Sequence, residues 1–309
     1  MGFTTYASTD ASAPVLTGEN GKLVALLHAC LVTGYGAKSA AGWSSTFTAA
    51  NKEIYRQGAG SQFYLRVQDD GPGTGAAREA RMIGYKAVSD VDTGTDPFPT
   101  AAQLTNGTIC RKSETADATA RAWYLFADSR TFYLMVSWNG GVYGSFVFGD
   151  FYSTASGDTH NCQIIGRIAE AAAGAAVTGE RLDVFSAINA AVTGSFIARS
   201  YTNLGTSVLQ SRHGDGVKGS TTVNVGTLPY PNAGDNGLYL SKVFVGESVL
   251  SNTRGRMRGY WHFLHPQASV NTGDICAGTG AMAGKTFVFF RSGNTGVHVF
   301  ETSDTLETN

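Results

Sequence analysis

Charged side chains are scarce in this sequence: Asp, Glu, Lys and Arg make up 15% of its 309 residues, where about 25% is usual. The formal net charge is -1, from 23 basic and 24 acidic residues. No run of basic residues is longer than two. Binding to nucleic acid depends on clustered Lys and Arg that neutralise phosphates. We therefore expect no nucleic-acid partner, and a surface covered largely by Ser, Thr, Asn, Gln and Gly.

Cysteine and long apolar runs are also lacking. The four cysteines are Cys30, Cys110, Cys162 and Cys276. They form no C-x-x-C pair, which excludes a zinc ribbon or a redox motif. We expect them to be free thiols in a protein made in a reducing cytoplasm. The longest apolar segment, Leu23 to Val32, contains His28 and is too short to span a bilayer. Met1 to Asp10 has no basic start followed by an apolar stretch, so we expect no secretory signal and no membrane segment.

The sequence contains no G-x-S-x-G elbow, no H-E-x-x-H motif and no P-loop in its proper context. Adjacent carboxylates occur at Asp69 and Asp70, directly before a Gly-Pro-Gly stretch. Asp favours such places because its side chain caps backbone amides in turns. We interpret both as turn residues, with calcium binding together with Asp90 as a minor alternative. We expect no catalytic residue and no cofactor, and hence not an enzyme.

The best metal candidate is the alternating set Asp158, His160 and Cys162. Residues two apart on a strand share one face, so three possible ligands are expected to lie together. A closed zinc site needs further ligands that this pattern does not supply. A structural role for the three residues is therefore favoured over a metal site.

Tryptophans offer a possible platform for a host surface glycan. The candidates for stacking on a sugar are Trp43, Trp138 and Trp261, and Trp123 is the fourth tryptophan of the chain. Large aromatic side chains in β-proteins more often fill the core, because each buries much area. We favour core positions and keep glycan stacking as the alternative.

One short early helix is expected after an N-terminal arm. Leu23, Leu26, Leu27, Cys30 and Leu31 recur at spacings of three and four, which marks one face of a helix. Gly34 is well placed to end it.

Most of the remaining sequence has the pattern of short strands. Phe63, Leu65 and Val67 alternate with polar residues, a period of two. The richest part is a predicted three-strand meander with turns at Asp128-Ser129-Arg130 and Asn139-Gly140-Gly141. Further strands are expected over 52–57, 61–70, 77–90, 108–113, 160–170, 238–248 and 256–266, and a hairpin across Ser292 to Gly296, whereas 91–100, with its two prolines, is expected to be a loop. The fold class predicted is mainly β, an antiparallel β-sandwich-like arrangement.

Composition shifts divide the chain into four parts. We expect an N-terminal arm at 1–20, a β-rich domain with the early helix at 21–170, a weakly structured insertion or linker at 171–237, and a C-terminal β-hairpin region at 238–309 that completes the fold. The end of the third part, from His213 to Gly237, has a loop-like background of glycine and polar residues, which suggests an exposed interaction surface.

Three quoted segments carry a family resemblance. They are TDASAPVLTGENGKLVALLHACLVTGYG, AAGWSSTFTAANKEIYRQGAGSQFYLRVQDDGPGTGAAREARMIGYKAVSDVDTGTDPFPT and AGKTFVFFRSGNTGVHVFETSDTLE. They resemble virion structural proteins from the late gene modules of tailed bacteriophages and prophages. The resemblance spans most of the chain and weakens over residues 171–237. Its motifs carry no known chemistry, so no functional residue is transferred.

The resemblance implies a virion component, of tail, tail-tip or baseplate type, made in the bacterial host cytoplasm. Its expected partners are copies of itself and other virion proteins. Two alternatives remain open: a head-decoration protein, and a carbohydrate- or receptor-binding module of the tail. Low charge agrees with an assembly role, because it gives little protection against self-association.

Overall fold

The computed structural model describes residues 2–70, 78–139, 142–168, 193–203, 207–214, 231–247, 252–265, 269–291 and 297–303. One α-helix, α1 (Lys22–His28), continues into the π-helical turn η1 (Ala29–Thr33). The strands up to the meander are β1 (Thr4–Ala7), β2 (Ser44–Ala49), β3 (Lys52–Arg56), β4 (Tyr64–Gln68), β5 (Glu79–Tyr85), β6 (Ala87–Asp90), β7 (Thr93–Thr95) and β8 (Thr108–Arg111). The later strands are β9 (Trp123–Ala127), β10 (Thr131–Asn139), β11 (Val142–Asp150), β12 (Tyr152–Ser153), β13 (Cys162–Arg167), β14 (Thr193–Ile197), β15 (Val208–Gly214), β16 (Leu240–Glu247), β17 (Asn252–Phe263), β18 (Ile275–Ala277), β19 (Thr286–Arg291) and β20 (Val297–Glu301).

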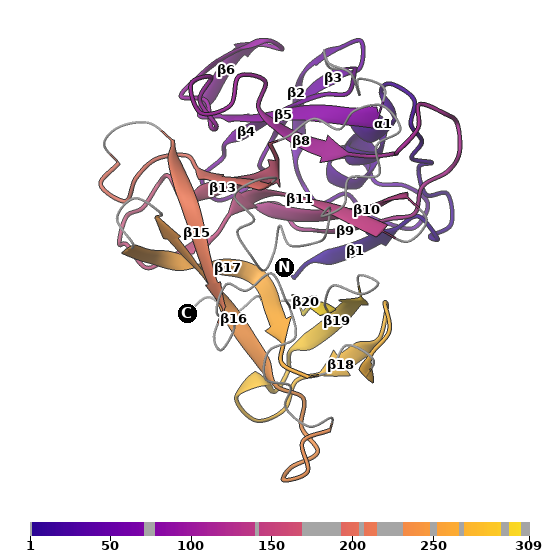
Figure 1. Cartoon of the computed structure of the whole chain (residues 1–309), viewed down its shortest axis with the longest axis vertical. Coiled ribbons are helices and arrows are strands. Elements are labelled where there is room, and N and C mark those ends of the chain that lie inside the picture. Colours follow the sequence, from indigo (N-terminus) through magenta and orange to yellow (C-terminus); the bar gives the residue numbers. More distant parts are fainter. Residues whose placement is uncertain are drawn as a thin grey trace.

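The predicted fold class is confirmed: the protein is mainly β, with antiparallel sheets that include a curled half-barrel, and the described residues contain one short α-helix (Figure 1). An N-terminal sheet contains β1 to β5, β8 to β11, β13 and β14, and a C-terminal sheet contains β12 and β16 to β20. Strand β15 pairs with β14 of the first sheet and β16 of the second, so it joins them. No helix in the described part of the chain is long and apolar enough to cross a membrane.

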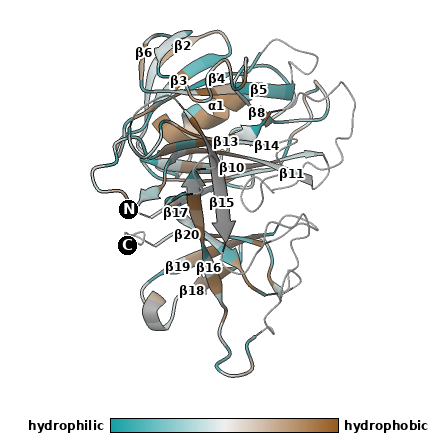
Figure 2. Ribbon diagram, turned by 60° about the vertical axis from the view of Figure 1, so that its left-hand side comes forward, coloured by the Kyte–Doolittle hydropathy of each residue, from teal (hydrophilic) through white to brown (hydrophobic). Residues whose placement is uncertain are grey.

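The early helix forms where the leucine spacing predicts it. The five residues of the predicted apolar face are completely buried; they are Leu23, Leu26, Leu27, Cys30 and Leu31. They belong to a first hydrophobic cluster, which also takes residues from one face of the N-terminal sheet. Figure 2 shows α1 as an apolar ribbon against these strands. Gly34 ends the helical segment at φ 80°, a conformation that glycine adopts without steric cost.

Residues 2–20, the described part of the N-terminal arm predicted at 1–20, combine short extended segments with turns and pack against the body of the protein. Strand β1 pairs with β9, and Leu16 forms an isolated bridge with Arg121. Phe3, Tyr6 and Leu16 are buried. These side chains are part of the protein's own hydrophobic core, so the segment is held against it.

The predicted meander is confirmed in β9, β10 and β11, which pair in sequence order. Its apolar runs are continuous because both faces of these strands are buried. On β10, Phe132 and Leu134 face the first cluster, whereas Tyr133 and Met135 face a second cluster. The Asp128 carboxylate holds the β9–β10 turn by accepting hydrogen bonds from the N–H groups of Arg130 (2.9 Å) and Thr131 (3.0 Å).

The C-terminal sheet is apolar on both faces as well. Tyr260, Phe290 and Phe300 point into the second cluster, which lies between the two sheets. Trp261 and Phe289 point away from it into a third cluster. The protein is therefore layered as first cluster, N-terminal sheet, second cluster, C-terminal sheet and third cluster.

Buried ion pairs accompany the apolar contacts between the sheets. Arg254 on β17 is completely buried and contacts the Asp158 and Glu247 carboxylates, with N–O distances of 2.8 Å in each case. Arg258, on the same face of the strand, pairs with Asp128 of the β9–β10 turn. The charges lie where strand β17 meets loops of the N-terminal sheet, so they help to fix the relative position of the two sheets.

Several strands differ from the sequence-based expectation, among them β2 and β18, which it did not include. The run 77–90, expected as one strand, is divided between β5 and β6, and the expected loop 91–100 contributes β7, which pairs with β6. In β7, Gly94 lies against the ring of Tyr85. Neither the spacing of apolar residues in 77–90 nor the prolines in 91–100 indicated this contact, because it joins residues on different strands.

The predicted insertion or linker at 171–237 lies mostly outside the described residues. Its described parts include β14 and β15, which carry the chain from one sheet to the other. The predicted C-terminal hairpin is confirmed, since β19 and β20 pair from Arg291↔Val297 to Phe287↔Glu301. Its turn, from Ser292 to Gly296, lies outside the described residues.

Candidate functional site

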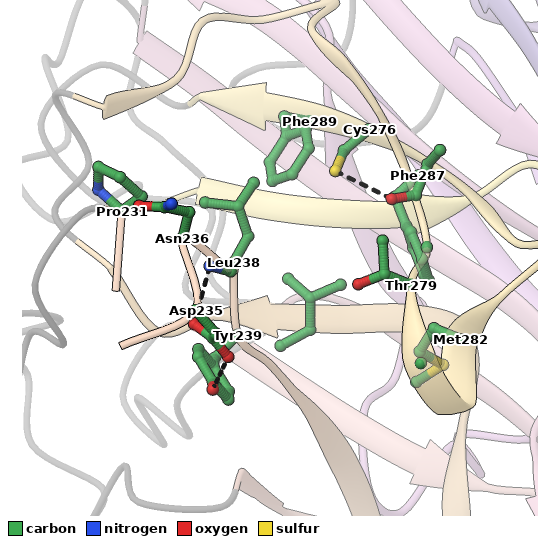
Figure 3. A pocket seen from close by; sticks show the side chains of 15 residues that line it. Pro231, Asp235, Asn236, Leu238, Tyr239, Cys276, Thr279, Met282, Phe287 and Phe289 are labelled. Atoms are coloured by element: carbon green, nitrogen blue, oxygen red, sulfur yellow. Dashed lines mark hydrogen bonds between the residues drawn. The ribbon is translucent and has the colours of Figure 1, made fainter. Parts of the chain in front are cut away.

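A pocket of about 750 Å³ opens at the outer face of the C-terminal sheet (Figure 3). One wall is the loop 231–239 that leads into β16. The opposite wall is formed by β18, β19 and the short 3-10 turn η5 (Gly280–Met282). The apolar lining residues belong to the third cluster or pack against it; they are Leu238, Leu240, Cys276, Met282, Phe287 and Phe289. The third cluster is therefore accessible from solvent at this pocket.

The polar part of the pocket centres on the carboxylate of Asp235. Its Oδ1 accepts hydrogen bonds from the side-chain amide of Asn232 (2.7 Å) and from the backbone N–H of Gly237 (2.9 Å). Its Oδ2 accepts one from the Tyr239 hydroxyl (2.5 Å). Asn236 adopts φ 54°, a left-handed conformation that Asn tolerates better than most residues. The short loop thus holds an exposed carboxylate in one orientation.

Backbone contacts fix the position of Tyr239. Its N–H donates to Nε2 of His265 (2.7 Å), and its carbonyl accepts from the N–H of Leu264 (3.1 Å). The side chain is 40% exposed. Held at its backbone and at its hydroxyl, the ring presents an apolar surface beside a carboxylate.

The hydrogen-bond network also sets the protonation states. The Tyr239 hydroxyl, and then the N–H of Gly237 and the amide of Asn232, lower the pKa of Asp235. The same bond to Asp235 raises the pKa of the Tyr239 hydroxyl. At neutral pH the carboxyl is ionised and the phenol is neutral. Since the described lining residues include no Lys, Arg or His, the pocket suits a neutral or cationic ligand better than an anion.

The metal candidates Asp158, His160 and Cys162 do not share the face of one strand, because β13 begins only at Cys162. Asp158 lies in the preceding turn and is engaged by Arg254 through both of its oxygens. His160 Nδ1 lies 3.0 Å from Oδ1 of Asn203, and Cys162 is buried in the first cluster. Across the described residues, no group of three His, Cys, Asp or Glu is arranged to hold a metal ion.

The glycan-stacking candidates Trp43, Trp138 and Trp261 are at most 4% exposed. The indole N–H of Trp43 donates to the carbonyl of Asp128 (2.6 Å), and the guanidinium of Arg111 covers the ring of Trp138 at 4.0 Å. Rings that are covered by protein on both faces present no surface to a sugar. All three tryptophans lie buried in the structure, in the core positions that the sequence favoured, and glycan stacking by them stays a prediction.

Asp69 acts at the start of a helix, and the stretch 71–77 that follows it, where a turn was predicted, lies outside the described residues. Its Oδ2 accepts a hydrogen bond from the N–H of Leu23 (2.7 Å) at the start of α1, and its Oδ1 lies 2.5 Å from Nζ of Lys112. Both side chains are completely buried. Burial raises the pKa of Asp69 to about 6, against the opposing effect of Lys112. The carboxylate has a structural role that its sequence neighbours did not indicate.

No sequence motif predicted the pocket. Part of it lies in the segment 213–237, where an exposed interaction surface was expected. The turn-forming stretch PNAGDNG, residues 231–237, was the available signal. The opposite wall is more than 35 positions away along the chain, so spacing did not connect them. No protein-family model matches the chain, and no curated protein matches it.

Proposed function

We propose that the protein is a structural subunit of a tailed-bacteriophage particle, located in the tail, the tail tip or the baseplate. It acts through contacts with copies of itself and with other virion proteins. The observation that carries the proposal is the resemblance of residues 9–36, 40–100 and 283–307 to virion structural proteins.

The layered architecture supports this role. Both sheets are buried on their two faces by the three clusters. Well-packed interiors have low compressibility and transmit strain. A subunit built in this way keeps its shape under load, as a component of a particle must.

The edge of the C-terminal sheet supports a contact between subunits. Among the described strands, β18 pairs with β19 alone, so no described strand pairs with its other edge. Ile275 on this strand is 70% exposed. An exposed edge strand with an apolar side chain is a template for pairing with another chain. We assign β18 as a contact strand of the assembled particle.

Mass spectrometry of purified particles tests the proposal. The protein should be found at a fixed copy number in particles that have been separated from host lysate. Its absence from particles would refute a structural role. Gold-labelled antibodies on intact particles then distinguish the positions, since label on the tail supports the proposal and label on the head supports the head-decoration alternative.

The contact strand has its own test. Ile275→Lys places a charge on the edge and should reduce the sedimentation coefficient of assemblies while the monomer keeps its circular dichroism spectrum. Val15→Lys is the matched control, because Val15 is 61% exposed and lies outside β18. Equal assembly of the Ile275→Lys variant and the unmodified protein would remove β18 from the contact.

A further inference from the structure

The pocket beside β18 combines two surfaces that a sugar needs. The first is polar: the Asp235 carboxylate is fixed by donors from Asn232, Gly237 and Tyr239 before any ligand arrives. An ionised carboxylate has about four acceptor sites, and three are used by these donors. Because the carboxylate is open to solvent, a ligand hydroxyl can donate to it without rearrangement of the loop, and a site fixed in advance loses little conformational entropy on binding.

The second surface is apolar. The partly exposed ring of Tyr239 and the side chains of Leu238, Met282 and Phe287 line the pocket. Figure 3 shows Leu238 and Met282 on opposite walls, with the phenylalanines on the strand behind them. The C–H face of a pyranose packs on an aromatic ring, and a methyl group can enter the apolar interior.

The charge and the size of the pocket restrict the class of ligand further. Asp235 is the sole carboxylate among the described lining residues, and none of them is cationic. A phosphate, a sulfate or an acidic sugar would face this carboxylate without a compensating charge. A purely apolar protein side chain would cover Asp235 and leave part of it without a partner, which is costly. The volume lies within the range of about 300–1,000 Å³ that is usual for small-molecule sites.

We propose that this pocket binds a neutral sugar that carries an acetamido group, with a ring hydroxyl on Asp235, the pyranose face on Tyr239 and the acetyl methyl group between Leu238 and Met282. An acetamido sugar fits both surfaces, because it joins hydroxyl donors to a small apolar group. The binding function goes beyond the proposed assembly role and does not depend on it.

Ligand-observed NMR with the full chain tests the ligand class. The probes are the methyl glycosides of N-acetylglucosamine and N-acetylgalactosamine, and the controls are methyl glucoside and methyl galactoside, which lack the acetamido group. At least one acetamido sugar should bind about tenfold more tightly than its matched control. Equal affinities would overturn the role of the apolar interior. Binding of choline, an organic cation, with no binding of any sugar would overturn the proposal.

Variants and a thiol reporter locate the binding. Tyr239→Ala should weaken sugar binding about tenfold, whereas Tyr201→Ala should leave it unchanged, because Tyr201 is 46% exposed but does not line the pocket. Cys276 lines the pocket and is partly exposed, so bound sugar should slow its alkylation, measured by peptide mass spectrometry. Binding that is unaffected by Tyr239→Ala and gives no protection of Cys276 would place the sugar elsewhere and overturn the proposal. If the protein is present in particles but binds none of these sugars, the sugar-binding proposal is refuted and the proposed assembly role is retained.

Discussion

Replacing Arg254 by Met removes the most heavily engaged charge between the two sheets. The guanidinium donates to both oxygens of Asp158 and to Oε1 of Glu247, with N–O distances of 2.8 Å in each case. It also donates to the backbone carbonyls of Arg199 and His160. The Asp158 and Glu247 side chains are 1% and 2% exposed. Met keeps most of the volume of the side chain but leaves two buried carboxylates without their cation.

The expected loss is large. Breaking a buried ion pair by removing one partner costs about 3–5 kcal/mol, because the remaining charge is left uncompensated. Urea unfolding followed by tryptophan fluorescence should show a free energy of unfolding lower by about this amount at pH 7. The melting temperature should fall by on the order of 10 °C, from a shift of roughly 2–4 °C per kcal/mol in chains of this size.

The loss should depend on pH in a definite direction. Although burial alone would raise the pKa of Asp158, the hydrogen bonds from Arg254 and Ser153 lower it below its usual value. In the native protein this carboxylate therefore stabilises the fold above its ordinary pKa, and the contribution is lost only as the pH falls through the lowered pKa. In the variant, burial acts without the cation and favours the protonated acid. The difference between the two proteins should thus shrink as the pH falls from 7 towards about 4.

Two comparisons make the test decisive. Lys22→Met breaks an exposed pair with Glu19, whose side chains are 43% and 48% exposed, and should cost less than about 1 kcal/mol. The triple variant with Arg254→Met, Asp158→Asn and Glu247→Gln should recover part of the stability, because no uncompensated charge remains. A loss below about 1 kcal/mol for Arg254→Met, or a loss that grows on acidification, would refute the reasoning.

Three further predictions concern other parts of the fold. Burial lowers the pKa of His298 to about 3. The neutral ring therefore stabilises the fold above pH ~6.5, and this contribution, at most roughly 5 kcal/mol, is lost as the pH falls towards 3. His298→Phe should make the free energy of unfolding depend less on pH over this range, and an unchanged pH dependence would contradict the prediction. Gly84→Ala should destabilise the fold by about 1–3 kcal/mol, since a Cβ atom would stand 2.3 Å from the ring of Phe98. Gly234→Ala is the control and should be nearly neutral in thermal unfolding, because its Cβ atom would lie 3.5 Å from the Asn232 side chain. A thiol reagent should modify Cys276 much faster than the other three cysteines, which are buried, and equal rates in the native state would contradict the described core.

Much of the local structure follows from the sequence. The helical face from Leu23 to Leu31 and the alternation around Leu65 depend on spacing along the chain, which local geometry converts directly into buried and exposed faces. The meander was recognisable because its turns contain Asp, Asn and Gly between apolar runs. Continuous apolar runs indicate a strand buried on both faces, and β10 is such a strand.

The candidate site could be predicted only in part. The stretch 231–237 was recognisable as an exposed loop. The Asp235 carboxylate and Tyr239 line a pocket only because β18, β19 and Met282 lie opposite them in the folded protein. The tryptophans were conspicuous as residue types, yet their burial depends on neighbours such as Arg111 that are distant in the sequence. The alternation at Asp158 and Cys162 suggested a shared strand face, but a turn begins that segment.

The sequence by itself determined the β class, the early helix and the exclusion of familiar catalytic motifs, because these depend on composition and on contacts a few residues apart. Only the tertiary structure decided which charges pair and where a pocket opens. Arg254 meets Asp158 across 96 positions, and the two walls of the pocket come from separate parts of the chain. Such contacts depend on which strands pair and in what register, and a shift of one residue would turn every side chain of a strand to its other face.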